Sequence, residues 1–312
     1  MVDSTLPLTK DKTKILFSLP DFYGNFDQIM FLNYLKHAMP QFFRDNCVID
    51  SAYGTIPGCI WNGGRTQLGT APRDNIDETF RNYANEGISV RLTFTNKFIN
   101  ESDLNDRFCN NVLKAAQSFG ENGVNTCSDI LANYIRKNYP SLYLINSTTR
   151  PVKTIEEINE LSKDTLTVPP YTINNTEAID SLKYPDNIEL LCCEACIDNC
   201  PNRKTHYDTI SKAQMFEPTE PFMCPHGCEQ YYYYDLVPKR KHHISIDDIE
   251  EMYLPRGINK FKISGRNDNT INVIERFVNY FAKPEYRDHV RNMLLVGPIN
   301  MGPGPGGPPP QG

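Results

Sequence analysis

Six of the ten cysteines in this chain of 312 residues fall between positions 192 and 228. They stand in the runs CCEACIDNC and CPHGC, as Cys192, Cys193, Cys196, Cys200, Cys224 and Cys228. Thiolates at spacings of two to four residues can converge on one metal ion or one iron–sulfur cluster. The other four cysteines are spread singly along the chain and are typical of small buried apolar side chains.

A disulfide framework would account for dense cysteines in a small secreted domain. The chain begins MVDSTLPLTKDKTK, which lacks the apolar stretch of a signal peptide. A domain of this length also has enough core to fold without covalent staples. We therefore expect a cytoplasmic protein in a reducing compartment, with a metal or cluster on its cysteines.

Cys193 is the last residue of a predicted strand, Cys196 and Cys200 follow it, and Pro201 begins a predicted helix. The amino terminus of a helix stabilises negative charge, so three thiolates at this corner could bind a 4Fe-4S cluster. Cys224 or Cys228 would supply the fourth ligand. A zinc site could instead use Cys196 and Cys200 together with the CPHGC pair, and the spacing does not separate the two metals.

Short apolar runs rich in β-branched and aromatic residues alternate with amphipathic segments along the chain. Eight of these runs read as strands buried on both faces, at residues 14–20, 47–53, 88–94, 123–127, 141–146, 165–169, 188–193 and 260–264. Helical patterns lie between them, at 26–38, 102–116, 130–136, 154–161, 176–182, 203–215 and 270–281. Ser128 is a predicted N-cap, and Thr154 with Glu157 forms a capping-box pattern.

Eight strand–helix alternations predict an α/β protein with a (β/α)₈ TIM-barrel-like fold and a Cys-rich insertion late in the chain. The alternative is an open, doubly wound parallel sheet. We expect an N-terminal extension (1–13), one barrel domain (14–296) with insertions at about 54–75 and 217–256, and a flexible Gly/Pro-rich tail (297–312).

Polar residues gather where the predicted strands end, and closure of a barrel brings such ends to one face. The predicted pocket is lined by Asp21, Tyr23, Asp50, Trp61, Asn62, Arg65, Asn96, Asn146 and Arg266. Arg65 follows Gly63-Gly64, where the backbone can approach a ligand closely, and a guanidinium can clamp a carboxylate or phosphate. Alternatively, Arg65 pairs with Asp50 or Asp74 and pins its own loop.

Several functional classes are disfavoured by the sequence. A net charge of −6 and a pI of about 5.6 argue against a non-specific grip on nucleic acid. No apolar run reaches the roughly 20 residues needed to span a bilayer, so no membrane partner is expected. We find no nucleophile elbow, Walker loop, HExxH motif or dinucleotide fingerprint, which makes proteolysis a weak hypothesis.

The run IELLCCEACIDNCPNRKTHYDTIS resembles the cysteine region of the collagenase-like peptidase family. The stretches YGTIPGCIWNGGR and SDILANYIRKNYPSLYLINSTT support this resemblance. It implies a TIM-barrel-like fold and a four-iron cluster, with Cys193 and Cys200 matching the family spacing and Cys224 and Cys228 matching more loosely. Well-understood members of the family modify RNA bases or quinone precursors by oxygen-independent hydroxylation, and no catalytic residue carries over to this chain.

Two functions follow from these patterns. The first is a metal- or iron–sulfur-containing enzyme that modifies a nucleobase or small aromatic, with RNA or a small anionic or aromatic ligand as partner. The second is a non-catalytic barrel whose zinc or cluster is structural. It would serve as a binding or assembly module and contact a protein through Tyr231–Tyr234 and the C-terminal tail.

Overall fold

The computed structural model describes residues 11–65, 67, 69–174, 177–197, 199–225 and 237–297. Its eight parallel strands lie at the eight predicted places and pair in the order β6-β5-β4-β3-β2-β1-β8-β7. They are β1 (Ile15–Pro20), β2 (Cys47–Gly54), β3 (Ser89–Phe94), β4 (Gly123–Thr126), β5 (Tyr143–Asn146), β6 (Leu166–Thr167), β7 (Glu189–Leu191) and β8 (Lys260–Lys262).

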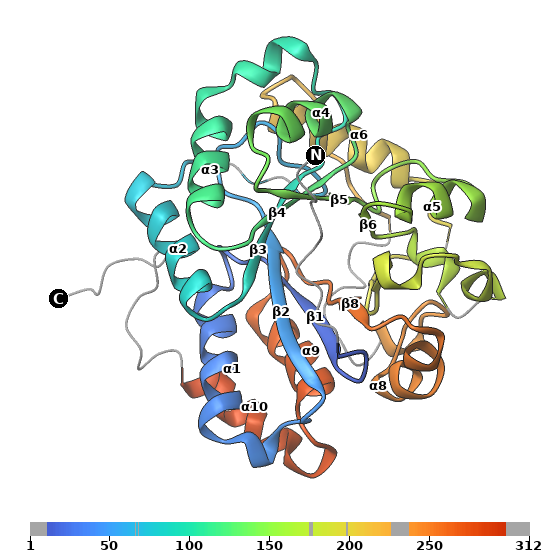
Figure 1. Ribbon diagram of the computed structural model, residues 1–312. Coiled ribbons are helices and arrows are strands. Elements are labelled where there is room, and N and C mark those ends of the chain that lie inside the picture. The colour runs from blue at the N-terminus through green and yellow to red at the C-terminus, as the bar shows by residue number, and fades with distance from the viewer. Residues whose placement is uncertain are drawn as a thin grey trace.

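The sheet closes on itself. Strand β1 pairs with both β2 and β8, and a parallel bridge between Thr167 and Ile188 joins the two ends of the sheet, beside β6 and β7. Helices surround the strands, as Figure 1 shows. The fold is therefore a (β/α)₈ TIM-barrel-like fold, as predicted, and the alternative of an open sheet is wrong.

The helices follow the strands around the barrel. They are α1 (Phe26–Ala38), α2 (Arg73–Asn85), α3 (Arg107–Ser118), α4 (Asp129–Asn138), α5 (Ile155–Ser162), α6 (Arg203–Gln214), α8 (Ile246–Asp248), α9 (Thr270–Phe281) and α10 (Arg287–Val296). Ser128 caps α4 and the Thr154–Glu157 capping box opens α5, as predicted. The segment predicted as a helix at 176–182 forms a 3₁₀ turn at Glu177–Ser181 instead.

Helices α2, α8 and α10 were not predicted. The buried residues Ile76, Phe80 and Tyr83 of α2 recur at helical spacing, so the signal was present behind the Gly/Pro-rich stretch that precedes it. Helix α10 packs against α9 and α1, which brings the two ends of the barrel domain together (Figure 1).

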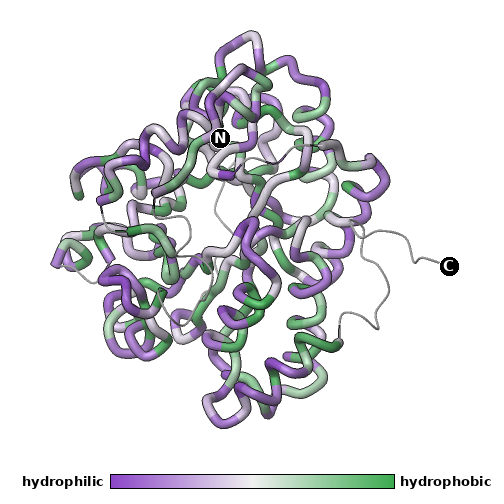
Figure 2. The backbone as a smooth tube through the Cα atoms, turned by 180° about the vertical axis from the view of Figure 1, so that it is seen from behind, coloured by the Kyte–Doolittle hydropathy of each residue, from purple (hydrophilic) through white to green (hydrophobic). Residues whose placement is uncertain are grey.

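The apolar core lies between the strands and the helices. Phe17, Val90 and Phe261 point outward from their strands into this layer and are fully buried. The helices alternate between hydrophobic and hydrophilic residues along their length, as Figure 2 shows. Successive side chains of a strand point to opposite faces, so the residues next to Phe17, Val90 and Phe261 point toward the barrel interior.

The barrel interior holds charged side chains. Arg91 on β3 donates to Asp50 on β2 at 2.8 Å, to Tyr143 on β5 at 2.9 Å, and to Glu189 on β7. Lys260 on β8 lies in the same region and donates to the backbone oxygen of Asp186 at 2.7 Å. Four strands are thus tied together by one buried ion-pair network in the half of the barrel nearer the strand amino ends.

Parts of the predicted insertion and tail lie outside the described residues, including Cys228, Tyr231–Tyr234 and everything after Gly297. The predicted N-terminal extension is described only from Asp11 onward. Within the described ranges, the helices are all too short or too polar for a membrane span.

Candidate functional site

A small cavity, here called the mouth cavity, opens where the strands end at their carboxyl side. Its volume is about 70 Å³, which admits a few waters or one small ligand. Five strands (β2, β3, β5, β7 and β8) and the segments that follow them form its wall, which is lined by Tyr53, Gly64, Arg65, Thr93, Thr95, Ser147, Thr148, Thr149, Leu191, Glu194, Tyr207, Lys262, Ser264, Gly265 and Arg266.

Three cationic side chains converge on the mouth cavity. Arg65 donates to the backbone oxygen of its neighbour Gly64 at 2.7 Å, and Arg266 donates to that of Gly63 at 3.0 Å. The ammonium nitrogen of Lys262 lies 3.7 Å from the centre of the Tyr53 ring. These two arginine hydrogen bonds go to neutral carbonyls, while the carboxylate of Glu194 also lines the cavity and interacts electrostatically with Arg65.

The pKa values of these groups reflect their burial. Burial lowers the pKa of Lys262 to about 7, with Arg91 and Arg266 adding to the effect and Glu189 opposing it. Burial also lowers the pKa of Arg266. For Arg65 burial is again the largest influence and acts in the same direction, but Glu194, Tyr207, Cys196 and Tyr53 together outweigh it and raise the pKa.

Several buried polar atoms around the mouth cavity have no hydrogen-bond partner within the described structure. They are the hydroxyl oxygens of Thr93, Thr95 and Thr148 and the Nη1 atom of Arg266. A buried polar group without a partner costs about 1–3 kcal/mol, so such groups usually meet water or a ligand. Hydroxyl and guanidinium donors together suit the oxygens of a carboxylate, phosphate or similar anion.

The glycine pair in the WNGGR loop allows this convergence. A Cβ atom on Gly63 would collide with the Thr95 carbonyl, and one on Gly64 would lie 2.5 Å from the Arg266 side chain. Gly64 also has a φ of +77°, which favours glycine. The loop can therefore pass directly over the end of β3 and bring Arg65 beside Arg266.

A second small cavity, here called the thiol pocket, adjoins the mouth cavity and has a volume of about 50 Å³. The two share Arg65, Glu194 and Tyr207. Cys196, Cys200, Cys224, His206 and Phe222 are among the remaining residues that line the thiol pocket. Three of the predicted metal ligands are thus neighbours of one cavity.

Cys193 lies elsewhere, fully buried, where its sulfur accepts a hydrogen bond from the Ser264 amide at 3.3 Å. Burial raises the pKa of Cys193, but Cys192, Arg276 and Ser264 outweigh it and bring the value to about 7. Across the described ranges, no group of three or more His, Cys, Asp or Glu side chains is arranged to hold a metal ion. Since Cys228 falls outside those ranges, both the iron–sulfur cluster and the zinc site stay predictions.

Of the nine predicted pocket residues, Arg65 and Arg266 line the mouth cavity. Asp50 lies deeper in the barrel and pairs with Arg91, so Arg65 does not use it as a partner. Asp21 adopts a φ of +60° and accepts from the Gly24 amide at 3.2 Å, which shapes the turn after β1. Tyr23 is half-buried, hydrogen-bonds Asn75 and packs against the core.

The remaining four predicted residues brace loops. Trp61 is fully buried, packs edge-on against Phe94 and Tyr134, and donates to the Asp103 carbonyl at 3.0 Å. The amides of the other three donate to backbone carbonyls: Asn62 to Ile56, Asn96 to Ile60 and Ser211, and Asn146 to Leu161.

Lys262, Thr93 and Thr95 line the mouth cavity and were not predicted as site residues. A signal for Lys262 existed in the strand KFKIS. Two lysines flanking a core phenylalanine in a barrel strand must both point into the barrel, because side chains alternate along a strand. The threonines carried no such signal, since β-branched residues are common in any strand.

A larger groove of about 580 Å³ leads away from the mouth cavity and shares Thr148, Thr149 and Tyr207 with it. Its wall includes Arg203, whose guanidinium lies 4.9 Å from the Tyr171 ring and 5.0 Å from the Tyr207 ring. The groove gives a ligand held at the mouth cavity room to extend.

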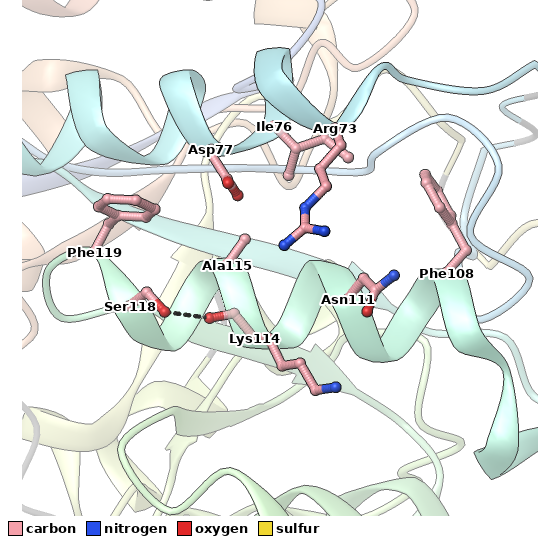
Figure 3. Close-up of a pocket in the computed structure, with 9 residues that line it drawn as sticks. All are labelled: Arg73, Ile76, Asp77, Phe108, Asn111, Lys114, Ala115, Ser118 and Phe119. Carbon is pink, nitrogen blue, oxygen red and sulfur yellow. Dashed lines mark hydrogen bonds between the residues drawn. The ribbon is translucent and has the colours of Figure 1, made fainter.

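A separate hollow of about 210 Å³ lies on the outer surface between α2 and α3. Figure 3 shows its lining, with the Ser118 hydroxyl bonded to the Lys114 carbonyl one turn earlier. None of its nine lining residues has a buried polar side-chain atom without a partner. It therefore lacks the feature that marks the mouth cavity.

Fold and site together define a (β/α)₈-barrel protein with a cationic cavity at the carboxyl ends of its strands. Protein-family models and curated proteins give no match to the chain. Among solved structures, the U32 peptidase Mk0906 is similar with a TM-score of 0.49 and 14% identity, over 84% of this chain and 98% of that one. A GH113 β-1,4-mannanase is similar with a TM-score of 0.30 and 8% identity, over 91% and 98% of the two chains.

The U32 peptidases are the collagenase-like family named above from the cysteine run. At a TM-score of 0.49 and 14% identity, the likeness between the two structures is a distant one.

Proposed function

We propose that the mouth cavity binds a small anionic ligand and that this binding is the basis of the protein's activity. The observation that carries the proposal is the convergence of three cationic side chains on a cavity whose buried threonine and arginine donors lack partners. The carboxyl ends of barrel strands are also the face on which TIM-barrel enzymes place their active sites.

Inorganic phosphate and pyruvate are suitable probes, since both present anionic oxygens, and acetamide is an uncharged comparison. We expect both anions to raise the melting temperature of the protein and to bind in calorimetry. Replacement of Arg65 by Met should weaken binding about tenfold or more, because a charged hydrogen bond contributes roughly 1.5–3 kcal/mol.

The matched control is Arg256→Met, which removes an exposed arginine that pairs with Asp180 and does not line the mouth cavity. It should leave anion binding unchanged. Equal binding by the Arg65→Met variant, or equal binding of acetamide, would contradict the proposal.

A second candidate is the metal-containing enzyme predicted from the cysteine run, in its oxygen-independent hydroxylase form or with zinc. The observation that favours it is that Cys196, Cys200 and Cys224 line a pocket sharing Arg65 and Glu194 with the mouth cavity. Thiolates there would supply the ligands, and a bound metal or cluster would contribute charge or redox chemistry beside the anion.

Anaerobic purification followed by metal analysis and a visible spectrum tests this candidate. We expect bound iron with broad visible absorbance, or stoichiometric zinc without it, and loss of the metal in a Cys196→Ser, Cys200→Ser double variant. The matched control is Cys109→Ser, in a buried cysteine of α3. Metal-free protein, or metal retained by the double variant, would contradict this candidate.

A further inference from the structure

Lys262 differs from the other lysine on its strand. Both Lys260 and Lys262 point into the barrel from β8 and are 7% exposed. Lys260 donates to the Asp186 carbonyl at 2.7 Å, which occupies its ammonium group. Lys262 donates to no atom of the described residues, and its nitrogen faces the mouth cavity over the Tyr53 ring.

The surroundings of Lys262 decide its protonation. The face of the Tyr53 ring favours the ammonium form, whereas burial and the nearby Arg91 and Arg266 favour the neutral amine, and Glu189 opposes them. The net result is a pKa of about 7. A neutral lysine amine is a nucleophile, while an ammonium ion is not.

A carbonyl compound bound in the mouth cavity would meet this amine. The cavity places a nucleophilic nitrogen from β8 beside two guanidiniums that can hold a carboxylate. Its volume of about 70 Å³ suits a molecule of a few heavy atoms. A 2-oxo acid carries both groups on adjacent carbons, so one end can pair with the arginines while the other faces the amine.

We propose that Lys262 forms an imine with a small 2-oxo acid held by Arg65 and Arg266. The nitrogen lone pair attacks the carbonyl carbon, and the two amine protons leave on the carbonyl oxygen as water, forming the C=N bond. Proton uptake from solvent then gives the iminium ion, an electron sink for reactions at the adjacent carbons. This inference rests on the proposed anion-binding function and names its ligand class.

Reductive trapping tests the inference. The protein is incubated with pyruvate and cyanoborohydride at pH 7, which reduces an iminium to a stable secondary amine, and the modified lysines are located by peptide mass spectrometry. We expect Lys262 to be modified at least about tenfold faster than the exposed Lys12, because Lys262 lines the cavity that holds pyruvate and its pKa is about 7.

Two variants separate the imine from non-specific labelling. Lys262→Arg keeps the positive charge but cannot form the imine, and it should lose the fast modification. Lys260→Arg, on the same strand and the same side, should keep it. Modification of Lys262 no faster than that of Lys12, with the protein folded by circular dichroism, overturns the inference.

Binding of pyruvate and phosphate, measured in parallel by calorimetry, distinguishes the two failures. Anion binding without a Lys262 adduct overturns the imine and leaves the proposed function standing. The absence of both anion binding and an adduct overturns the two together.

Discussion

Among the single residues, Arg91 connects the charged and polar side chains in the half of the barrel interior nearer the amino ends of the strands. Its guanidinium contacts Asp50 and Glu189, and Tyr143 accepts from its Nε atom. Removal of one member of such a buried ion pair is costly, because it leaves the partner's charge buried and uncompensated. These residues come from four strands, so the network links β2, β3, β5 and β7 inside the barrel.

Lys262 lies above this network and makes the stability of the protein depend on pH. Its pKa is about 7 in the folded protein, against 10.5 for an unperturbed lysine, so between these values the unfolded chain binds more protons. Unfolding free energy should therefore rise with pH across this window, by at most about 1.4 kcal/mol per pH unit from this group.

We expect the Lys262→Met variant to lose this contribution. Urea unfolding of the variant and of the original protein at several pH values from 7 to 10 should show a stability difference that favours the variant at pH 7 and shrinks as the pH rises. Lys137→Met, in an exposed lysine at the end of α4, is the control and should follow the original protein. Parallel pH profiles for Lys262→Met and the original would contradict this assignment.

Among the secondary-structure elements and loops, the loop between β2 and α2 positions Arg65 in the site. Trp61 anchors it in the apolar core, and the glycine pair that follows passes over the end of β3. Arg65 then reaches the mouth cavity beside Arg266, which lies in the loop after β8. The tryptophan and the glycines thus act through placement of the arginine, without contact to a ligand.

Replacement of Gly63 by Ala should disrupt this placement, because the new Cβ would collide with the Thr95 carbonyl. We expect a loss of about 1–3 kcal/mol of stability, as for overpacking elsewhere, together with loss of anion binding. Fluorescence of Trp61, the single tryptophan, reports the unfolding transition, and calorimetry with phosphate reports binding.

Gly69→Ala is the control in the same loop. A Cβ there meets open space, although a φ of +95° makes the substitution cost about 1–2 kcal/mol in backbone strain. It should destabilise the protein while binding persists. Loss of anion binding in both variants, or in neither, would contradict the role given to Gly63.

In the molecule as a whole, closure of the barrel brings the segments that form the site together. Lys262 and Arg266 come from β8 and the loop after it, while Arg65, Thr93 and Thr95 come from the region of β2 and β3. These segments are about 170 residues or more apart in the chain, and they meet because β1 pairs with β8 on one side and β2 on the other. An open sheet ending between β1 and β8 would have kept them apart.

The amino-acid pattern by itself determined the eight strands, most of the large helices and the barrel class. Short apolar runs and caps such as Ser128 and Thr154 depend on local geometry, which a few neighbouring residues decide. It also indicated Arg65 and Arg266 at strand ends. Helices α2, α8 and α10 escaped prediction, although the apolar residues of α2 have helical spacing.

Only the tertiary structure decided which polar side chains share a cavity. Asp50 and Lys262 are both polar strand residues. Asp50 forms an ion pair with Arg91 deep in the barrel, whereas Lys262 lines the mouth cavity. Likewise Cys193 turns to Ser264 while Cys196 and Cys200 line the thiol pocket. Partners from distant strands make these choices, because hydrogen bonds and burial depend on neighbours that barrel closure supplies and local sequence does not contain.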